Sequence, residues 1–493
     1  MSKQQNDALA YIGGEWLETG KWRDNINPAD TRDIVGRAVD CGTQEAKSAI
    51  AAAKSALPKW KATPAPVRGE IILRAMLLME NRLEELAQAL SREQGKVLAE
   101  SRGEVKKSIK ILEFISGEGR RFGGDVIPSE MPNTFCYTIR QPLGVVGLIT
   151  PWNFPVAIPV WKIAPALVAG NTVVFKPAKL TPLTGRIVTE IFLEAGIPPG
   201  VLNFLPGPGS TAGNELATNP DVAAISFTGS NEIGMHLYDQ TAKQNKKCQC
   251  EMGGKNPLVL LADGNVALAA AATIDGAFGS TGQRCTATSR AIVERPVYDE
   301  FVQLVAAGAK KLHVGNPLHD GIQMGPSVDS SQYETVHKYI QIGKGEAKLA
   351  AGGNKLTTGE MKHGFFTEPT VFVDVKPDAR IAQEEIFGPV LSVIPVDNFD
   401  EALEVANNVK FGLSSSVYTN DLRLAQQFVE KIETGITHVN SPTLGGEAQL
   451  PFGGIKATGV GEREMGPTAV QFYSELKTVY VDYTGTKRQT NIY

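Results

Sequence analysis

A cysteine among small and flexible residues is the first candidate for chemistry in this chain. Cys285 lies in the segment 279–290, where glycine, serine and threonine leave its sulfur unshielded. The neighbouring Arg284 would lower the thiol pKa and so favour the thiolate, which is the nucleophilic form. The alternative is a small residue that fills a gap in a core segment, because free cysteines are usually buried.

Three other segments carry groups that complement a thiol. Asn153 stands between two prolines in the segment 149–155, and Glu251 is followed by a flexible Gly-Gly pair. A third segment, 384–390, holds Glu385 and Phe387. A nucleophile, an amide donor and a carboxylate are what attack on a carbonyl, stabilisation of its oxyanion and activation of water require.

The elements that must position these residues alternate between strand and helix. Strands are predicted over 172–175, 201–205, 222–227, 291–294, 370–374 and 390–396, and helices over 181–195, 210–217, 231–242, 266–278 and 299–312. This alternation predicts βαβ units and parallel sheets. Ligands of such sheets bind beyond the carboxyl ends of the strands, so a dinucleotide site is expected there.

Glycines follow two of these strand ends. Gly207, Gly209 and Gly213 are spaced one residue wider than the usual dinucleotide fingerprint, so a plain strand-to-helix turn remains the alternative. Gly229 and Ser230 begin the next helix, where free N–H groups offer a second seat for phosphate.

Outside this region, helices are predicted over 43–57, 67–95 and 105–122, with a break at 58–66. A hairpin is predicted over 135–149 and an edge strand over 476–483. Such edges need a partner, and pairing across a subunit interface would supply one. An oligomer, a dimer or a tetramer, is therefore expected.

Composition limits the size class, the partners and the compartment that can be expected for the protein. The 493 residues are 42% hydrophobic and 21% charged, which is ordinary for a globular protein of two or three domains. A net charge of −4 gives no reason to expect nucleic acid or an anionic membrane as partner. The polar N-terminus lacks a signal sequence, and five irregularly spaced cysteines favour a reducing cytoplasm. Cys248 and Cys250 are expected in a strand, and no metal site is expected.

At this point the chain resembles the aldehyde dehydrogenase superfamily over nearly its whole length. The motifs in register are those around Asn153, Glu251, Cys285 and Glu385, together with the segments 176–178, 227–230 and 451–456. The resemblance implies an α/β fold of two Rossmann-type parallel-sheet domains plus a β arm. It places an NAD(P)-binding domain at 1–134 and 151–255, an oligomerisation arm at 135–150 and 473–493, and a catalytic domain at 256–472.

The same resemblance implies a role for each matching residue. Cys285 would attack the aldehyde, Asn153 would hold the oxyanion and Glu251 would activate water. Lys176 and Glu385 would bind ribose hydroxyls, Ser230 the phosphates, and Phe387 would pack beside the nicotinamide ribose. The full expected cofactor site, for NAD or NADP, comprises Thr150, Pro151, Trp152, Lys176, Lys179, Gly209, Gly213, Gly229, Ser230, Glu385 and Phe387.

One departure bears on the cofactor. Lys179 stands where many NAD-preferring members carry a glutamate that binds the adenosine ribose. Replacing a carboxylate by a cation removes repulsion toward a 2′-phosphate, so NADP is expected to be accepted. The alternative is a lysine that simply points to solvent.

The substrate is expected to be a small anionic aldehyde. Arg121 and Arg284 would bind a distal anion, with Trp161 and Phe452 as further substrate contacts. The segment 282–290 looks most like that of 2-oxoglutarate semialdehyde (2,5-dioxopentanoate) dehydrogenases. In several other semialdehyde enzymes an arginine occupies the position of Trp161, which weighs against a simple aliphatic acid such as succinic semialdehyde.

Several alternatives stay open. The two arginines also match non-phosphorylating glyceraldehyde-3-phosphate dehydrogenases, or they form ordinary surface ion pairs. Broad aldehyde specificity, release of the acyl group to coenzyme A, and a catalytically dead structural relative are the others. Intact Glu251 favours hydrolysis, and intact Cys285, Glu251 and Asn153 argue against a dead relative.

Overall fold

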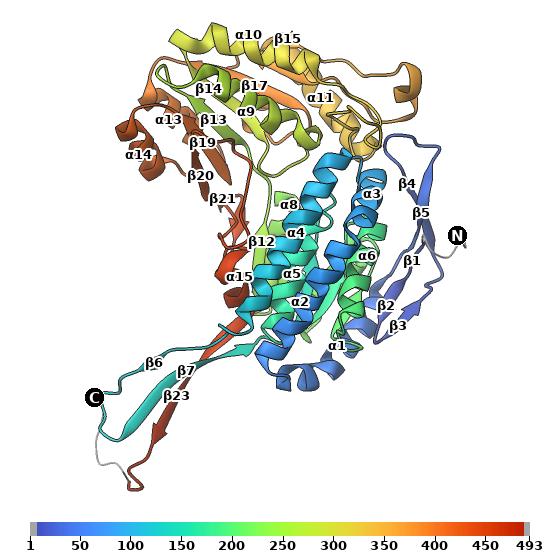
Figure 1. Cartoon of the computed structure of the whole chain (residues 1–493), viewed down its shortest axis with the longest axis vertical. Coiled ribbons are helices and arrows are strands. Elements are labelled where there is room, and N and C mark those ends of the chain that lie inside the picture. The colour runs from blue at the N-terminus through green and yellow to red at the C-terminus, as the bar shows by residue number, and fades with distance from the viewer. Residues whose placement is uncertain (1–6, 488–493) are drawn as a thin grey trace.

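Two large sheets of mainly parallel strands, each covered by helices, form the body of the protein, and a thin β arm extends from it (Figure 1). The computed structural model describes residues 7–487. The predicted α/β class is therefore confirmed.

The first sheet contains eight strands in the order β22-β12-β11-β8-β9-β10-β2-β3. Its five central strands are parallel and buried, as continuous apolar strand sequences require. In sequence order its strands are β2 (Ala10–Ile12), β3 (Glu15–Leu17), β8 (Val145–Ile149), β9 (Thr172–Lys176), β10 (Leu202–Phe204), β11 (Val222–Thr228), β12 (Lys247–Glu251) and β22 (Gly459–Val460).

Helices cover both faces of this sheet. Alternate residues of β8 enter opposite cores, with Val146 and Leu148 in one and Val145 and Ile149 in the other. The first core belongs chiefly to α2 (Ala65–Asn81), α3 (Leu83–Gln94), α4 (Leu98–Glu118), α5 (Ala157–Val168), α6 (Pro182–Glu194) and α15 (Gly466–Phe472). The second belongs to α1 (Thr43–Ala62), α7 (Asn214–Thr218) and α8 (Asn231–Ala242).

The second sheet contains seven strands in the order β15-β16-β17-β14-β13-β19-β20, and only β15 is antiparallel. Its strands are β13 (Asn256–Leu260), β14 (Thr288–Glu294), β15 (Lys348–Ala351), β16 (Thr370–Val373), β17 (Val390–Val396), β19 (Ser414–Tyr418) and β20 (Ile436–Val439). On one face lie α9 (Val266–Phe278) and α10 (Arg295–Lys311); on the other lie α11 (Ser330–Glu346), α12 (Arg380–Gln383), α13 (Phe399–Asn407) and α14 (Leu422–Lys431).

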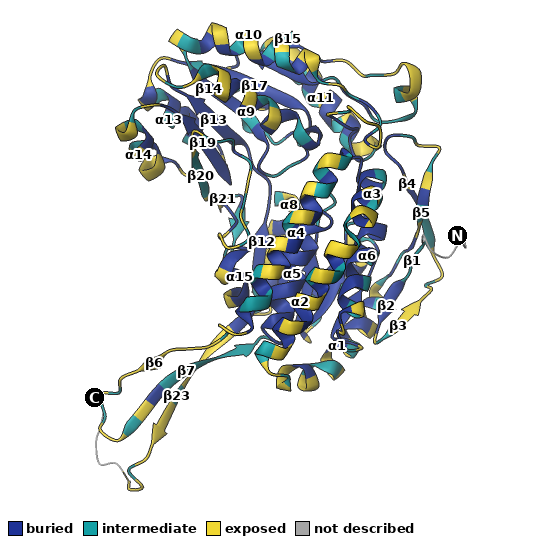
Figure 2. Cartoon of the chain, in the orientation of Figure 1, coloured by how far each residue is buried: buried dark blue, intermediate teal, exposed yellow. Residues whose placement is uncertain are grey.

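Three small sheets complete the fold. One contains β1 (Asp7–Ala8), β4 (Trp22–Ile26) and β5 (Ile34–Val39), and another β18 (Phe411–Gly412) and β21 (Ile455–Lys456). The arm contains β6 (Val126–Ile127), β7 (Thr134–Pro142) and β23 (Ser474–Asp482). The arm is the most exposed part of the molecule (Figure 2).

The hairpin predicted over 135–149 is wrong. β7 pairs with β23 and β6 in the arm, whereas β8 is a central strand of the first sheet. The reason is burial, because all five residues of β8 are buried and β7 is mostly half-buried. The arm segment predicted as 135–150 therefore ends before β8.

Other boundaries also differ from the sequence-based ones. The helix predicted over 67–95 is divided into α2 and α3 at Arg82, and α1 continues through Pro58 as far as Ala62. Near the C-terminus, β22 pairs with β12 and α15 contacts α5, so part of the segment 256–472 returns to the first sheet. The predicted terminal strand is present as β23, while residues 488–493 of the predicted arm lie outside the described residues.

Candidate active site

The first sheet has a switch point between β8 and β11. From β8 the chain moves outward through β9 and β10, and then returns to the other side of β8 with β11 and β12. Crevices outside such strand ends are the usual ligand sites of open α/β sheets. The segments 150–153 and 228–230 follow the two strands that flank this point.

A cavity of about 270 Å³ lies at this place, and we call it the cofactor cleft. Seven of the residues expected from the sequence line it, namely Pro151, Trp152, Asn153, Gly229, Ser230, Glu385 and Phe387. The rings of Trp152 and Phe387 meet edge to face with centroids 5.3 Å apart. Cys285 also lines this cleft.

The cleft has the groups that a dinucleotide needs. Ser230 is the N-cap of α8, so free N–H groups and the positive helix end face the phosphate position. A side chain at position 229 would meet the ring of Phe227 at 2.4 Å, so only glycine allows this close turn. Glu385 offers a carboxylate, with one oxygen accepting the Gly254 N–H at 2.9 Å. These residues fit NAD(P).

The remaining cofactor candidates lie at neighbouring strand ends. The buried Lys176 donates to the carbonyl oxygens of Pro177 and Gly207, and burial lowers its pKa to about 8. Gly213 lies beside its side chain, whereas a Cβ at Gly209 would meet open space. Lys179 is exposed, and the Thr150 hydroxyl is buried without a hydrogen-bond partner among residues 7–487.

The segment that carries Cys285 belongs to the second sheet, just before β14. Ser280, Thr281 and Gly282 have consecutive positive φ values of 50°, 60° and 67°. A Cβ at position 282 would lie 2.2 Å from the Gly388 carbonyl oxygen, which requires glycine. The Asn256 side-chain amide donates to the carbonyl of Cys285 at 2.7 Å and so fixes the thiol-bearing backbone.

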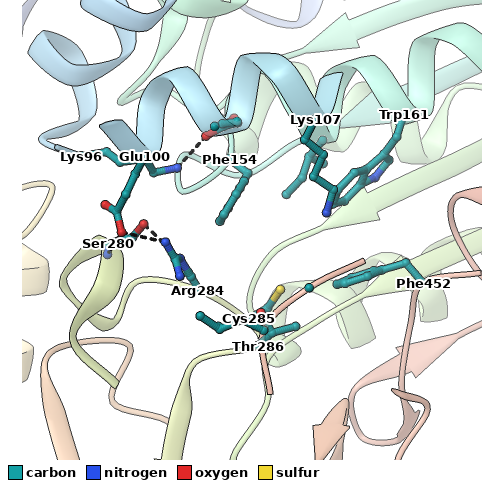
Figure 3. A pocket seen from close by; sticks show the side chains of 15 residues that line it. Lys96, Glu100, Lys107, Phe154, Trp161, Ser280, Arg284, Cys285, Thr286 and Phe452 are labelled. Atoms are coloured by element: carbon teal, nitrogen blue, oxygen red, sulfur yellow. Dashed lines mark hydrogen bonds and ion pairs between the residues drawn. The ribbon is translucent and has the colours of Figure 1, made fainter. Parts of the chain in front are cut away.

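A second cavity of about 270 Å³ opens on the other side of Cys285, and we call it the thiol pocket (Figure 3). Its aromatic wall contains Phe154, Trp161 and Phe452, of which the last two stack with centroids 5.5 Å apart. Lys107 and Arg284 bring positive charge into it. Because Cys285 and Ile158 line both cavities, the sulfur lies where they meet.

Electrostatics at Cys285 differ from the sequence-based expectation. Burial, and next the carboxylate of Glu251, raise the pKa of this thiol to about 12. The cation that lowers the pKa is Lys107, not Arg284. Arg284 instead pairs with Glu100 at 2.7 Å and donates to the Ser280 hydroxyl at 3.0 Å, so its charge is compensated away from the sulfur. The resting thiol is therefore protonated at neutral pH.

Glu251 ends β12 and is almost fully buried. Its Oε1 atom has no hydrogen-bond partner among the described residues. Burial, and next the neighbouring Glu464, raise the pKa of Glu251 well above its ordinary value. Glu464 itself pairs with Lys162, which also donates to Ser226 at 2.7 Å. A carboxyl group with a raised pKa and a free oxygen has the properties of a general base.

Asn153 lies in a turn that a second buried ion pair holds. Lys96 donates to the carbonyl of Asn153 at 2.9 Å and pairs with Glu104 at 2.5 Å. Glu104 in turn accepts the N–H groups of Val156 and Ala157 at the start of α5. The side chain of Asn153 remains in the wall of the cofactor cleft, which Cys285 also lines.

Of the four expected substrate contacts, the thiol pocket contains Arg284, Trp161 and Phe452 but not Arg121. Arg121 is largely exposed and pairs with Glu118 at 2.6 Å. Its guanidinium lies 5.8 Å from the ring of Phe114, which lines a separate outer cavity of about 620 Å³. The structure thus gives Arg121 an ordinary surface ion pair.

Sequence reasoning missed six ionisable residues of this site, Lys96, Glu100, Glu104, Lys107, Lys162 and Glu464. A signal existed for Lys162, because it is the one charged residue in the apolar sequence of α5. Lys107 lies in a lysine pair on an amphipathic helix, a pattern that also fits a solvated face.

A cleft that fits NAD(P), lies at a sheet switch point and meets a thiol-lined pocket is typical of a dinucleotide-dependent dehydrogenase. The comparisons with known proteins agree. The profile described as "Aldehyde dehydrogenase family" matches residues 16–479.

Among curated proteins, an α-ketoglutaric semialdehyde dehydrogenase of Bacillus subtilis is 44% identical over 97% of this chain and 99% of its own. A 2,5-dioxopentanoate dehydrogenase of Saccharolobus solfataricus is 42% identical over 95% and 98%. A crystal structure of betaine aldehyde dehydrogenase from Staphylococcus aureus with NAD+ aligns with a TM-score of 0.95 at 32% identity, over 97% of this chain and 95% of that one.

The chain belongs to the aldehyde dehydrogenase family. It is an oxidoreductase that oxidises an aldehyde to a carboxylic acid with NAD(P). The predicted resemblance, enzyme class and cofactor are thereby confirmed.

The raised pKa of Cys285 predicts how the free enzyme reacts with iodoacetamide. The rate of alkylation of Cys285 should rise continuously up to pH 10 without a plateau, because the pKa lies near 12. Glu251→Gln should increase the rate several-fold at pH 9, since one pKa unit changes the thiolate fraction about tenfold. Mass spectrometry of the alkylated peptide measures the rate.

Cys285→Ala provides the control that separates this site from the other cysteines, all of which are free thiols. A plateau below pH 8 would contradict the burial argument. Slower alkylation of Glu251→Gln would show that Glu251 removes the thiol proton rather than opposing its loss.

Proposed function

We propose that this enzyme oxidises a small semialdehyde with a distal carboxylate, of the 2-oxoglutarate semialdehyde type. The observation that carries the proposal is the thiol pocket, which Cys285 lines together with three cationic side chains, Lys96, Lys107 and Arg284. Two carboxylates in the same wall pair with Lys96 and Arg284, so Lys107 supplies the excess positive charge. Its volume of about 270 Å³ suits a five-carbon acid better than a large aldehyde. The names of the relatives at 42–44% identity support the same substrate class.

The proposed chemistry has two halves that share Cys285. Its Sγ releases its proton to solvent water and forms a bond to the aldehyde carbon, and the carbonyl oxygen becomes an oxyanion. The Asn153 amide and the Cys285 N–H donate hydrogen bonds to that oxyanion, which lowers the barrier where charge develops. The nicotinamide, when bound, accepts the hydride with its electron pair, and the carbon remains attached to sulfur as a thioester.

Glu251 serves the second half. Its free oxygen takes a proton from water as the water oxygen attacks the thioester carbon. The C–S bond breaks, the thiolate takes up the proton that Glu251 accepted from the water, and the carboxylic acid leaves with Glu251 again ionised. A raised pKa makes Glu251 a competent acceptor near neutral pH, when a carboxylate of ordinary pKa would be a weak base.

The residues around the cofactor cleft have separate proposed duties. Ser230 and the first turn of α8 bind the phosphates, while Lys176 and Glu385 bind ribose hydroxyls. Trp152 and Phe387 pack against the nicotinamide half. The first-sheet residues 151–255 would thus form the core of the nucleotide domain, and 256–446 the domain that supplies the thiol.

A panel of aldehydes tests the proposed substrate class. Purified enzyme should give a higher kcat/KM for 2-oxoglutarate semialdehyde than for pentanal, glyceraldehyde 3-phosphate or benzaldehyde, as measured by NAD(P)H absorbance. Cys285→Ala should abolish turnover with every member of the panel. If glyceraldehyde 3-phosphate or the uncharged aldehydes were preferred, the semialdehyde assignment would be wrong while the family would stand.

Lys179 leads us to propose that NADP is used at least as well as NAD. Its ammonium is exposed at the end of β9 and has no ion pair with another described residue, and Arg23 donates to its backbone carbonyl at 2.9 Å. Because Arg23 is itself ion-paired with Asp40, Lys179 supplies the uncompensated positive charge that would favour a 2′-phosphate.

The variant Lys179→Glu should lower the ratio of kcat/KM for NADP over NAD by about tenfold or more, because the charge near the 2′-phosphate is reversed. Lys311→Glu, an exposed change on α10, should leave the ratio unaltered. An unchanged ratio in Lys179→Glu would mean that this lysine only points to solvent.

We also propose a homo-oligomer, a tetramer in the cytoplasm, in which the arm contacts a second copy. β23 is the outer strand of its sheet, and its far edge has no strand partner among residues 7–487. Leu476 and Tyr480 on this strand are 55% and 66% exposed. Long apolar edge strands are normally covered. The absence of any disulfide among the five cysteines fits a reducing compartment, which cell fractionation would check.

Light scattering should give a mass that is a multiple of 52.9 kDa for the wild-type enzyme. The double variant Leu476→Lys/Tyr480→Lys should dissociate to smaller species, because charges block the edge. Leu422→Lys, at another exposed leucine on α14, serves as control. A monomeric wild-type enzyme would refute the proposal.

A further inference from the structure

We propose that Lys107 is the cation that binds the distal carboxylate of the substrate, and that Arg284 shapes the thiol segment instead. This inference rests on the proposed semialdehyde function and names the residue that gives it specificity. The sequence drew attention to Arg284 because it neighbours the nucleophile. In the structure, Arg284 is next to Cys285 in sequence but its charge is paired with Glu100.

Lys107 comes from the middle of α4 and projects into the thiol pocket beside Trp161 (Figure 3). Its Nζ lies 5.3 Å from the centroid of the Trp161 ring and 5.8 Å from that of Phe452. Aromatic faces stabilise an ammonium without neutralising it. The two rings therefore hold the charge in place while leaving it free for an anion.

The ammonium of Lys107 has no hydrogen bond or ion pair with any other residue in the range 7–487. The nearby Glu104 is occupied by Lys96 and by two backbone N–H groups of α5. Burial lowers the pKa of Lys107, so an unpaired charge here is costly and a carboxylate partner would relieve that cost.

Arg284 presents the opposite case. Its guanidinium donates to Glu100 and to the Ser280 hydroxyl, and Glu100 also accepts the Ser280 N–H at 2.8 Å. These bonds hold the segment of positive φ that precedes Cys285. At Arg284 a substrate carboxylate would meet a charge that Glu100 already balances, whereas at Lys107 it would meet an ammonium with no carboxylate partner.

Lys107 also lies at the passage between two cavities. It lines both the thiol pocket and the outer cavity of about 620 Å³ formed with α4 and residues 446–449. A Cβ at Gly446 would lie 3.3 Å from the Lys107 Nζ, so the glycine leaves room for the ammonium and a ligand beside it. An aldehyde that reaches Cys285 from this side passes the lysine and leaves its far end there.

The test compares two aldehydes of five carbons, 2-oxoglutarate semialdehyde and pentanal. Lys107→Met should lower kcat/KM for the anionic aldehyde by about 10- to 100-fold, mainly through KM, because a charge-assisted contact is lost. The kcat/KM for pentanal should fall by a clearly smaller factor, because that aldehyde feels only the loss of the Lys107 charge near the Cys285 thiol. Circular dichroism reports whether the variant is folded. The inhibition constant of glutarate, an unreactive dicarboxylate, should rise in parallel.

Matched variants separate the possible causes. Lys107→Arg should retain much of the preference for the anion, and Lys106→Met, the exposed neighbour on α4, should retain all of it. Arg284→Met should affect both aldehydes alike, because it disturbs the thiol segment.

The inference is overturned if Lys107→Met keeps the preference, if Arg284→Met alone removes it, or if Lys107→Met slows pentanal equally through an effect on the thiol. A wild-type enzyme with no preference for the anion would instead refute the proposed substrate class itself.

Discussion

Two ligands have to reach one sulfur atom from opposite sides, and the fold is arranged to allow this. Cys285 comes from the second sheet, whereas Asn153 and Glu251 come from strand ends of the first. The short connection from β12 to β13 joins the sheets at this point. A Cβ at Gly254 would lie 2.8 Å from the carbonyl of Cys285, so this glycine lets the two backbones approach. The site therefore depends on the relative placement of the two sheets, and small errors there would separate the nucleophile from its partners.

The charges at this junction keep the thiol in its resting form. Glu251, Glu385 and Glu464 all raise the pKa of Cys285, and Lys107 opposes them. A protonated thiol reacts slowly with oxidants and other electrophiles. Because Cys285 lines both the cleft and the pocket, a charged ligand in either cavity would act on the same thiol.

Local sequence patterns predicted the α/β alternation, because most of the parallel strands carry continuous apolar sequences. The family motifs at strand ends indicated where Asn153, Glu251 and Cys285 would lie. The local patterns did not predict which strands belong to which sheet, because that depends on burial in the folded chain. β7 and β8 were both predicted as strands of one hairpin, yet β8 is fully buried and β7 forms the exposed arm. The effect of Arg284 that was expected on the pKa of Cys285 is not seen for a similar reason, since Glu100 lies 184 residues away in sequence and its ion pair with Arg284 follows no local pattern. The same holds for Lys107, whose lack of a partner is a property of the folded chain.

Two buried ion pairs flank the junction, Lys96–Glu104 and Lys162–Glu464. Buried pairs are often no more stabilising than apolar residues of the same volume, so their presence calls for another reason. Here each pair has a geometric task. Lys96 and Glu104 together bind the carbonyl of Asn153 and the first N–H groups of α5, which fixes the turn between β8 and that helix. Lys162 and Glu464 lie near Glu251, where Glu464 keeps its pKa high. The first pair thus fixes the turn that carries Asn153, and the second pair adds to the effect of burial on the pKa of Glu251, so both act before any ligand arrives, which is what electrostatic preorganisation requires.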